Sequence, residues 1–281
     1  GFQPDLVWVN DRSGTNWHSV HDSVRGVDKA IYPNEWDAES TNAEGITSFD
    51  SDGFTLGTHS NNNNSGNNYS SYAWKANGAG VANTDGTIAS TVSANTTAGF
   101  SIVTYTAAGG DDQTYGHGLT KSPEFILLKN RTQGGGDNTG WQVYHVTSGN
   151  AQYMHLHNTN AQAPGAEIWN STTPTSTLVH LGASSHSNIV GNDYVAYIWH
   201  SVEGYSAMGG YNAQGVEDGI FIHCGFKPAF VMAHRTDSSG AWPMWDNVRG
   251  VRNLNKWVSY AHEAAAETVG DGTSSVCDFV S

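Results

Sequence analysis

Two histidines at alternate positions, His155 and His157 in the stretch "YMHLHN", are the residues best placed to bind a metal ion. Alternate residues of a β-strand point to the same face, so the two imidazoles would lie side by side. Zinc or nickel would need a further ligand from a neighbouring strand, and the sequence identifies none. His18 and His21 pose the same question. We predict no metal site and keep these histidines as candidates.

Two carboxylates, Asp50 and Asp52, lie close together in the stretch "FDSDGF". An EF-hand calcium loop needs a third ligand position and a closing Glu, and both are missing here. Asp followed by Gly is typical of a tight turn, which is the structure we predict. A calcium ion at Asp50 and Asp52 is the alternative.

Sequence motifs of catalysis are missing from this chain. It contains no G-x-S-x-G, no phosphate-binding loop, no H-E-x-x-H and no C-x-x-C, and no acidic pair stands out as a glycosidase site. We therefore predict a protein that is not an enzyme, with no catalytic residue and no cofactor.

The charge balance limits the partners. The chain has 12 Lys and Arg against 26 Asp and Glu, a net charge of −14, which repels phosphate backbones and anionic lipid. No apolar run approaches the ~18 residues of a membrane span. We expect no nucleic acid partner and no membrane insertion. Cys224 and Cys277 could pair or remain free thiols.

Repeated phrases divide the chain. "GFQPDLVWVNDRSGTNW" opens the sequence, "GFKPAFVMAHRTDSSGAW" begins at Gly225, and a weaker copy, "HGLTKSPEFILLKNRTQGGGDNTGW", begins at His117. Gly99 and Gly204 are 105 residues apart, and so are Pro123 and Pro228. Agreement between two pairs of landmarks indicates a repeated module of that length.

This period predicts three modules with boundaries near residues 98 and 203. The first, 1–98, would lack its N-terminal strand; the second, 99–203, would be complete; the third, 204–281, would lack its C-terminal part. Either the sequence is a piece of a longer protein, or strands from neighbouring molecules complete the modules.

The local pattern is that of short strands. Runs such as "DLVWV", "FILLK" and "YVAYIWH" are rich in β-branched and aromatic residues, and Asp-Gly and Asn-rich turns separate them. We predict an all-β fold of tandem β-sandwich modules of jelly-roll or concanavalin-like type. The one helical candidate is a short segment, 255–268.

Tryptophans that recur at one place in each copy are predicted to be core residues. They form two sets: Trp17, Trp141 and Trp242, and Trp74 and Trp199.

An Asp and an Arg three residues apart recur in the first and third copies. These pairs, Asp22 with Arg25 and Asp246 with Arg249, are predicted to be ion pairs that hold a loop in place. A role in ligand contact is the alternative.

Four tryptophans, Trp8, Trp36, Trp245 and Trp257, have no counterpart in the other copies. The shared core does not require them, so they are the candidates for contact with a glycan or a neighbouring subunit. Trp36, which lies among Asn34, Glu35 and Asp37, is the leading one, followed by Trp257. Packing within their own module is the alternative.

The phrases "GFQPDLVWV", "YAWKANG", "GFSIVTYTA", "PEFILLKNR" and "YVAYIWHSVEGYSAMGGYN" resemble a repeated domain of tailed-phage structural and tail-fibre proteins, especially of aquatic phages. The resemblance covers almost the whole chain; Trp36, the "NNNNSGNN" tract and the incomplete end modules depart from the pattern. It implies a virion or extracellular location, tandem β-sandwich modules compared with concanavalin or SPRY folds, and no known catalytic residues. The implied partners are copies of the same chain, other virion proteins and host-surface glycan.

Two other functions stay open at this point. One is a secreted carbohydrate-binding module. The other is a subunit of an extracellular filament that is assembled by strand exchange.

Overall fold

The computed structural model describes residues 1–215, 219–250, 255–269 and 277–279 of the chain. These residues form an almost entirely β structure of antiparallel sheets, which confirms the predicted all-β class. One short helix, α1 (Ser60–Asn63), lies in the Asn-rich tract. Among the described residues, no helix is long and apolar enough to cross a membrane.

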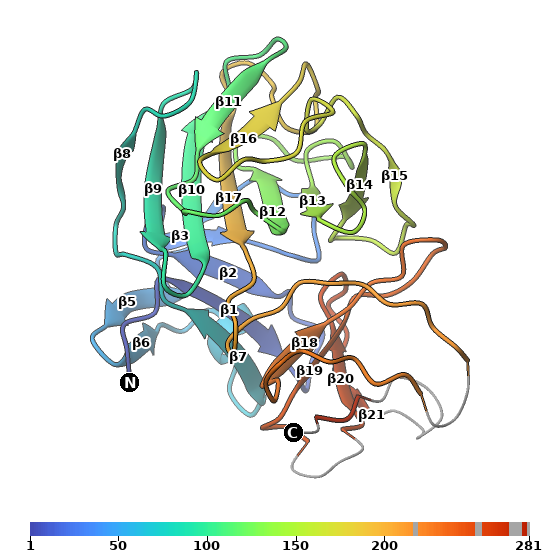
Figure 1. The fold of residues 1–281 in the computed structure, drawn as a ribbon. Coiled ribbons are helices and arrows are strands. Elements are labelled where there is room, and N and C mark those ends of the chain that lie inside the picture. Colours follow the sequence, from blue (N-terminus) through green and yellow to red (C-terminus); the bar gives the residue numbers. More distant parts are fainter. Residues whose placement is uncertain (216–218, 251–254, 270–276, 280–281) are drawn as a thin grey trace.

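The first sheet has the strand order β4-β3-β2-β1-β7. A separate hairpin of β5 and β6 packs beside it (Figure 1). The bounds of these strands are β1 Leu6–Asp11, β2 Ser19–Asp22, β3 Gly26–Ile31, β4 Ser40–Thr41, β5 Ile46–Asp50, β6 Gly53–Leu56 and β7 Tyr69–Trp74.

The second sheet is larger, with the order β15-β14-β13-β12-β17-β10-β9-β8. A two-stranded sheet of β11 and β16 covers one face of it. The bounds are β8 Val81–Asn83, β9 Ser90–Asn95, β10 Phe100–Thr106, β11 Gln113–Gly116, β12 Phe125–Asn130, β13 Trp141–His145, β14 Gln152–His155, β15 Ala163–Pro164, β16 Leu178–Leu181 and β17 Asp193–Trp199.

The third sheet has the order β18-β19-β20-β21. Its strands are β18 Phe230–Met232, β19 Pro243–Asp246, β20 Trp257–Tyr260 and β21 Thr268–Val269. The three sheets share one plan, because β1, β12 and β18 each pair with the strand that follows, and β1 and β12 also pair with a later strand, β7 or β17.

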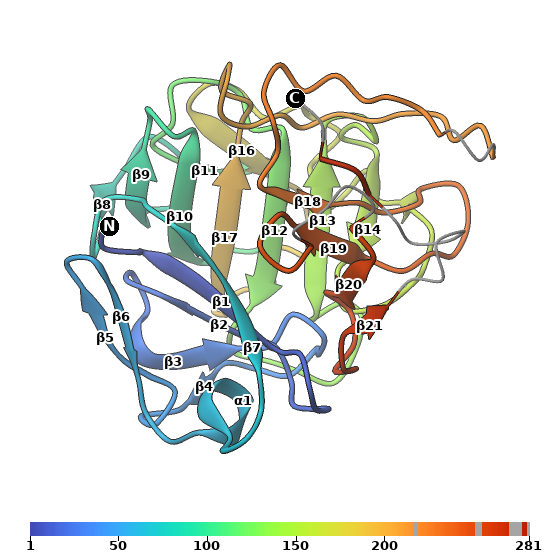
Figure 2. The ribbon, with the colours of Figure 1, turned by 90° about the horizontal axis from the view of Figure 1, so that it is seen from below.

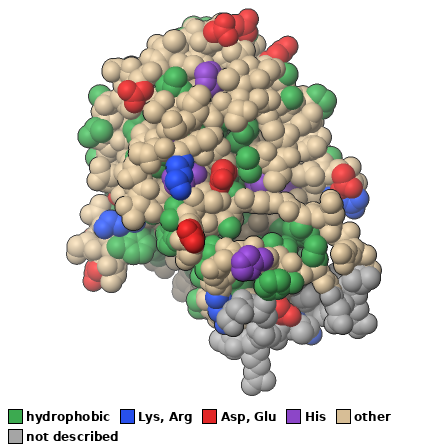
Figure 3. All heavy atoms as spheres, viewed as in Figure 1, with side chains coloured by type: hydrophobic (Ala, Val, Ile, Leu, Met, Phe, Trp, Pro, Cys, Tyr) green, Lys and Arg blue, Asp and Glu red, His purple; other side chains and the backbone are tan. Residues whose placement is uncertain are grey.

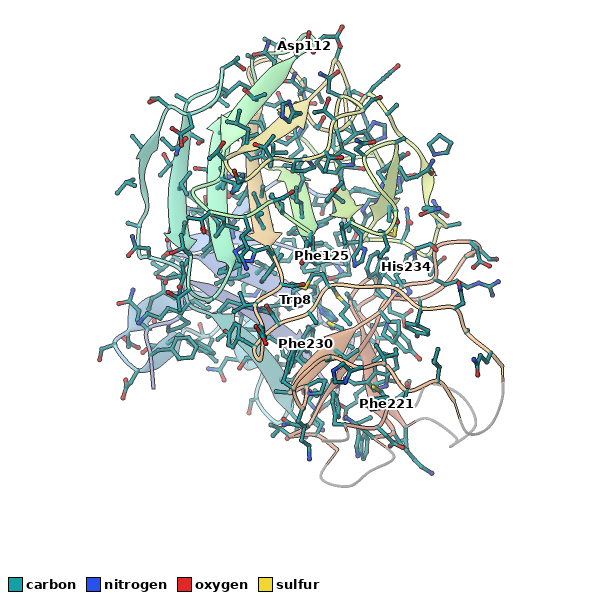
Figure 4. All side chains as sticks on the ribbon, in the orientation of Figure 1. Trp8, Asp112, Phe125, Phe221, Phe230 and His234 are labelled. Atoms are coloured by element: carbon teal, nitrogen blue, oxygen red, sulfur yellow. The ribbon has the colours of Figure 1, made fainter. Side chains whose placement is uncertain are left out.

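Alternation of side chains along the strands gives each sheet an inner and an outer face. The inner faces of all three sheets meet in one core (Figures 1 and 2). Trp8 of β1, Phe125 of β12 and Phe230 of β18 gather there, as Figure 4 shows. The outer faces are covered separately, by the β5–β6 hairpin on the first sheet and by β11 and β16 on the second. The fold therefore consists of three sheets around a shared centre.

Two sequence predictions about the elements need correction. Strands β9 and β10 pair along most of their length across residue 98, so the predicted boundary lies inside a hairpin, and 81–95 belong to the second sheet. The predicted helix at 255–268 is wrong: Trp257–Tyr260 is a strand that pairs with β19 and β21. Val258 and Ser259 in the middle of this strand are buried, whereas Trp257 at its start is exposed.

Candidate binding site

Strand register identifies which residues occupy equivalent places in the three sheets. Trp141 lies opposite Lys129 at the end of β12, and Trp242 occupies the corresponding place before β19. Both are nearly fully buried, at 1% and 3% exposure. In the first sheet the corresponding residue is His18, because Trp17 follows Pro4 by 13 residues whereas Trp242 follows Pro228 by 14. Trp17 is displaced to the surface, 38% exposed, so the prediction that it is a core residue is wrong.

The two buried indoles join neighbouring sheets. Trp141 Nε1 donates to the carbonyl of Tyr32 in the first sheet, at 2.8 Å, and Trp242 Nε1 donates to the carbonyl of His155 in the second, at 2.9 Å. Tyr32 and His155 hold equivalent places, just after or at the end of the third strand of their sheets. The same hydrogen bond is therefore made twice around the core.

We use the term seam for each contact between two sheets. Every seam contains an equivalent backbone hydrogen bond, and the three donor–acceptor distances are Glu39 N to Arg131 O, 2.9 Å; Gln162 N to Thr236 O, 3.1 Å; and Glu267 N to Arg12 O, 3.0 Å. The last of these connects the third sheet back to the first. The arrangement of the sheets is thus closed rather than linear.

The seam between the first and second sheets contains a buried ion network. Arg25 Nε lies 2.5 Å from Asp22 Oδ2, and Arg25 Nη1 lies 3.0 Å from Glu39, which also receives two hydrogen bonds from Arg131. The Tyr197 hydroxyl donates to Asp22 at 2.6 Å. Although burial opposes ionisation of Asp22, Arg25 and Tyr197 together hold its pKa below the usual value.

The same network recurs between the third and first sheets. Arg249 forms ion pairs with Asp246 and with Glu267, Glu267 pairs with Arg12 at 2.8 Å, and Arg249 Nη2 donates to the Tyr72 hydroxyl at 3.0 Å. Both predicted Asp–Arg pairs therefore lie in seams, where they connect sheets as well as loops. At the seam between the second and third sheets, the matching positions are the uncharged Ser148, Gln162 and Thr236 together with His145.

Trp36 lies on the loop that follows β3, at the seam between the first and second sheets, and is 44% exposed. The loop is held on both sides. Lys129 Nζ donates to the carbonyl of Trp36 at 3.4 Å, and Glu39 receives the paired hydrogen bonds from Arg131. A Cβ at Gly134 would come within 2.8 Å of the backbone of Asp37, so the loop of the second sheet approaches closely here. The backbone that carries the exposed indole is therefore held in place by contacts with the second sheet.

Polar side chains adjoin this indole. The ring of His157 lies edge-on to Trp36, with centroids 6.2 Å apart. His157 Nδ1 accepts from the backbone of Trp141, so Nε2 carries the proton and donates to Asp137 Oδ1 at 3.1 Å. Asn158 Nδ2 donates to the same oxygen at 3.4 Å. Half of the Asp137 side chain is exposed. We call Trp36, Asp137, His157 and Asn158 the Trp36 site.

The predicted histidine pair has a structural role here. His155 and His157 do lie together, with ring centroids 4.9 Å apart, and Tyr153 and His186 contact His155. Burial lowers the pKa of His155 to about 4 and also lowers that of His157. Within the described part of the chain, no group of three or more His, Cys, Asp or Glu side chains is arranged to hold a metal ion.

The other predicted site tryptophans fall into two classes. Trp8 and Trp245 are buried, 4% and 8% exposed, so their proposed surface contact is wrong. Trp8 occupies an inner-face position of β1 and donates to His18 Nδ1 at 3.0 Å, whereas Trp245 packs in the outer core of the third sheet. Trp257 is 39% exposed on the third sheet. Trp199 is buried and Trp74 is partly buried against the same core.

The remaining candidates are placed in structural roles. Asp50 and Asp52 lie at the β5–β6 turn, where Asp50 accepts a hydrogen bond from Thr55. His18 and His21 are fully buried, and burial lowers their pKa values to about 3 and about 4. Cys224 and Cys277 are free thiols.

Sequence reasoning missed Asp137 and Asn158 as neighbours of Trp36. No local pattern in the sequence identifies them, because both residues come from the second sheet and connect to Trp36 through His157.

The surface around the core is polar but contains few charges, as Figure 3 shows for one face. The fold and this surface define an all-β protein of three antiparallel sheets with a solvent-facing aromatic site. A model of the family "Domain of unknown function (DUF7483)" matches residues 1–281, and the chain belongs to that family. Searches of curated proteins and of solved structures gave no significant match.

Proposed function

We propose that this chain is a non-enzymatic structural protein of a phage virion, of the tail-fibre kind, and that the Trp36 site binds host-surface glycan. The proposal rests on the resemblance of its repeated phrases to phage structural proteins. The observation that carries the binding role is the Trp36 indole, 44% exposed on a loop fixed from both sides.

The chemistry of the site suits a sugar. The C–H face of a sugar ring packs on an aromatic ring, and carboxylates and amides accept or donate to the hydroxyls. Asp137 offers an exposed carboxylate and Asn158 an amide, and Asp137 is hydrogen-bonded to His157, whose ring contacts the indole. Glu35, whose pKa is raised by partial burial and by Asp37, offers a second carboxyl group at the same loop.

The test is adsorption of the purified chain to host cells, together with binding to a glycan array. Trp36→Ala should weaken binding by about fivefold or more, because one aromatic contact contributes roughly 1 kcal/mol or more. Its free energy of unfolding should change by less than about 1 kcal/mol, since the ring is exposed.

Trp17→Ala is the matched control, because Trp17 belongs to the same sheet and is exposed to a similar extent, 38%. It should leave binding unchanged. Equal binding by wild type and Trp36→Ala, or equal losses in both variants, would rule out the glycan role of Trp36. Trp257→Ala tests the second candidate in the same assay.

A secreted carbohydrate-binding module would share this site, so binding alone does not distinguish it from a virion protein. Immunogold labelling of purified native particles does. We expect label on the phage particle; label restricted to a cell surface or to soluble material would favour the secreted module.

A further inference from the structure

Strand β7 of the first sheet and strand β17 of the second are equivalent. Trp74 lies opposite Leu6 in the β1–β7 pair, as Trp199 lies opposite Phe125 in the β12–β17 pair. Tyr72 and Tyr197, two residues earlier, each contact the arginine of a seam network. β7 and β17 can therefore be compared residue by residue.

The two strands differ in what covers their second edge. In the second sheet, β10 pairs with β17 over its whole length, with Phe100 opposite Trp199 and Ile102 opposite Tyr197. In the first sheet, β7 is the last strand, and no described residue pairs with its other edge. An unpaired edge of six residues presents a row of backbone donors and acceptors to solvent.

A groove follows this free edge. It has a volume of about 510 Å³ and is lined by all six residues of β7 and, across from them, by Phe230 and Val248. The Tyr72 and Phe230 rings are 4.7 Å apart, and Trp74 remains partly exposed. Val248 is 78% exposed. The groove thus combines an open strand edge with apolar side chains.

We propose that the edge of β7 is an acceptor site for an added antiparallel strand with the sequence pattern of β10: aromatic, Ser, two aliphatic residues, Thr, Tyr. The precedent within this chain is the β10–β17 pair, which shows the sequence of a strand that pairs with an equivalent edge. In the same register, the aromatic residue of the donor lies opposite Trp74 and its first aliphatic residue lies opposite Tyr72. Both side chains then enter the groove.

The donor is a polypeptide segment with the β10 pattern other than residues 204–212 of this chain or of a second copy. Residues 204–212, "GYSAMGGYN", are the chain's own remaining variant of the β10 phrase, but Gly209 and Gly210 replace the residues that match Thr104 and Tyr105. Glycine in a strand interior weakens it. Met208 of this segment already packs against the core.

The probe is a synthetic peptide with the sequence of residues 99–107, GFSIVTYTA, titrated into the full chain. We expect saturable binding by fluorescence anisotropy and slower hydrogen exchange, by about tenfold or more, at those amides of Tyr69–Trp74 that face the free edge, since these amides become paired. Exchange in β10 and β17, which are already paired, should not change.

Two N-methylated peptides serve as controls. One is methylated at the positions of Ser101, Val103 and Tyr105, and the other at those of Ile102 and Thr104, so each blocks a different edge of the peptide strand. Only one of the two should bind, because an added strand pairs along a single edge.

Three results would overturn the proposal: no change in exchange at Tyr69–Trp74, equal binding of both methylated peptides, or self-association of the chain alone that protects these amides. Each result is independent of glycan binding at Trp36, which lies on a different seam.

Discussion

At the scale of single residues, buried charges connect the sheets at two of the three seams. Asp22 and Arg25 are fully buried and pair with each other and with groups of the second sheet. Removal of one partner leaves the other charge buried without compensation, which costs far more than the loss of an exposed ion pair.

We therefore expect Arg25→Ala to lower the free energy of unfolding by about 3–5 kcal/mol. The control is Arg235→Ala, which breaks a pair with Asp237 whose side chains are 61% and 75% exposed, and which should leave the free energy of unfolding nearly unchanged because solvent screens the pair. Urea unfolding measures both. Similar small losses in the two variants would contradict a structural role for the seam network.

Buried histidines predict acid sensitivity. Burial lowers the pKa of His18 to about 3, and those of His21 and His117 to about 4, against about 6.5 in the unfolded chain. The unfolded state binds more protons over this window, so stability is full above about pH 6.5 and falls as the pH drops toward about 4. Each histidine contributes about 1.4 kcal/mol per pH unit.

Urea unfolding at about pH 7 and about pH 5 measures this loss, and His18→Gln should reduce the difference by about 2 kcal/mol. Equal stability of the wild type at both values would show that these histidines are not held neutral. The carboxyl of Asp22, with a lowered pKa, contributes only at more acidic pH.

At the scale of strands, the sequence was sufficient to predict the all-β class and many of the strands. It was not sufficient to predict the position of every core residue and boundary. The β-branched and aromatic residues in "DLVWV" and "FILLK" predicted strands correctly. The prediction that the recurring Trp is a core residue failed at Trp17, because Trp17 follows Pro4 by 13 residues whereas Trp242 follows Pro228 by 14, so His18 takes the core position. The boundary at residue 98 failed because the repeat fixes a period but not the phase of the fold, and a β-hairpin spans that point.

The site was half predictable. Trp36 has no Trp counterpart in the other copies, and it is exposed, as predicted. Trp8 and Trp245 also have no Trp counterpart, yet they occupy core positions that all copies share. Leu127 and Met232 fill the position of Trp8 in the other sheets, and Tyr144 fills that of Trp245 in the second sheet. Asp137 and Asn158 come from a different sheet, and no local pattern could place them next to Trp36.

The indole hydrogen bonds across the seams give a prediction at this scale. Trp141→Phe removes the hydrogen bond from the indole to the buried carbonyl of Tyr32. It should therefore lower the free energy of unfolding by about 1–2 kcal/mol more than Trp169→Phe does. Trp169 is equally buried, but its Nε1 has no hydrogen-bond partner among the described residues. Thermal or urea unfolding compares the two; equal losses would mean that the seam hydrogen bond contributes nothing.

At the scale of the whole molecule, three sheets share one inner core and three equivalent backbone bonds connect them in a closed order. A closed arrangement explains why the Asp–Arg phrase recurs: each copy stabilises a different seam. The middle copy lacks the phrase, and its seam with the third sheet has the backbone and indole hydrogen bonds without an ion network.

The contact between Arg12 and Glu267 tests the closed arrangement most directly, because 255 residues separate them and a linear row of modules would keep them apart. The measurement is a double-mutant cycle with Arg12→Ala and Glu267→Gln, each alone and combined, by urea unfolding. The closed arrangement predicts a coupling energy of about 0.5–3 kcal/mol, similar in sign to that of the equivalent pair Arg131 and Glu39. A coupling energy of zero for Arg12 and Glu267, with a clear coupling for Arg131 and Glu39, would contradict it.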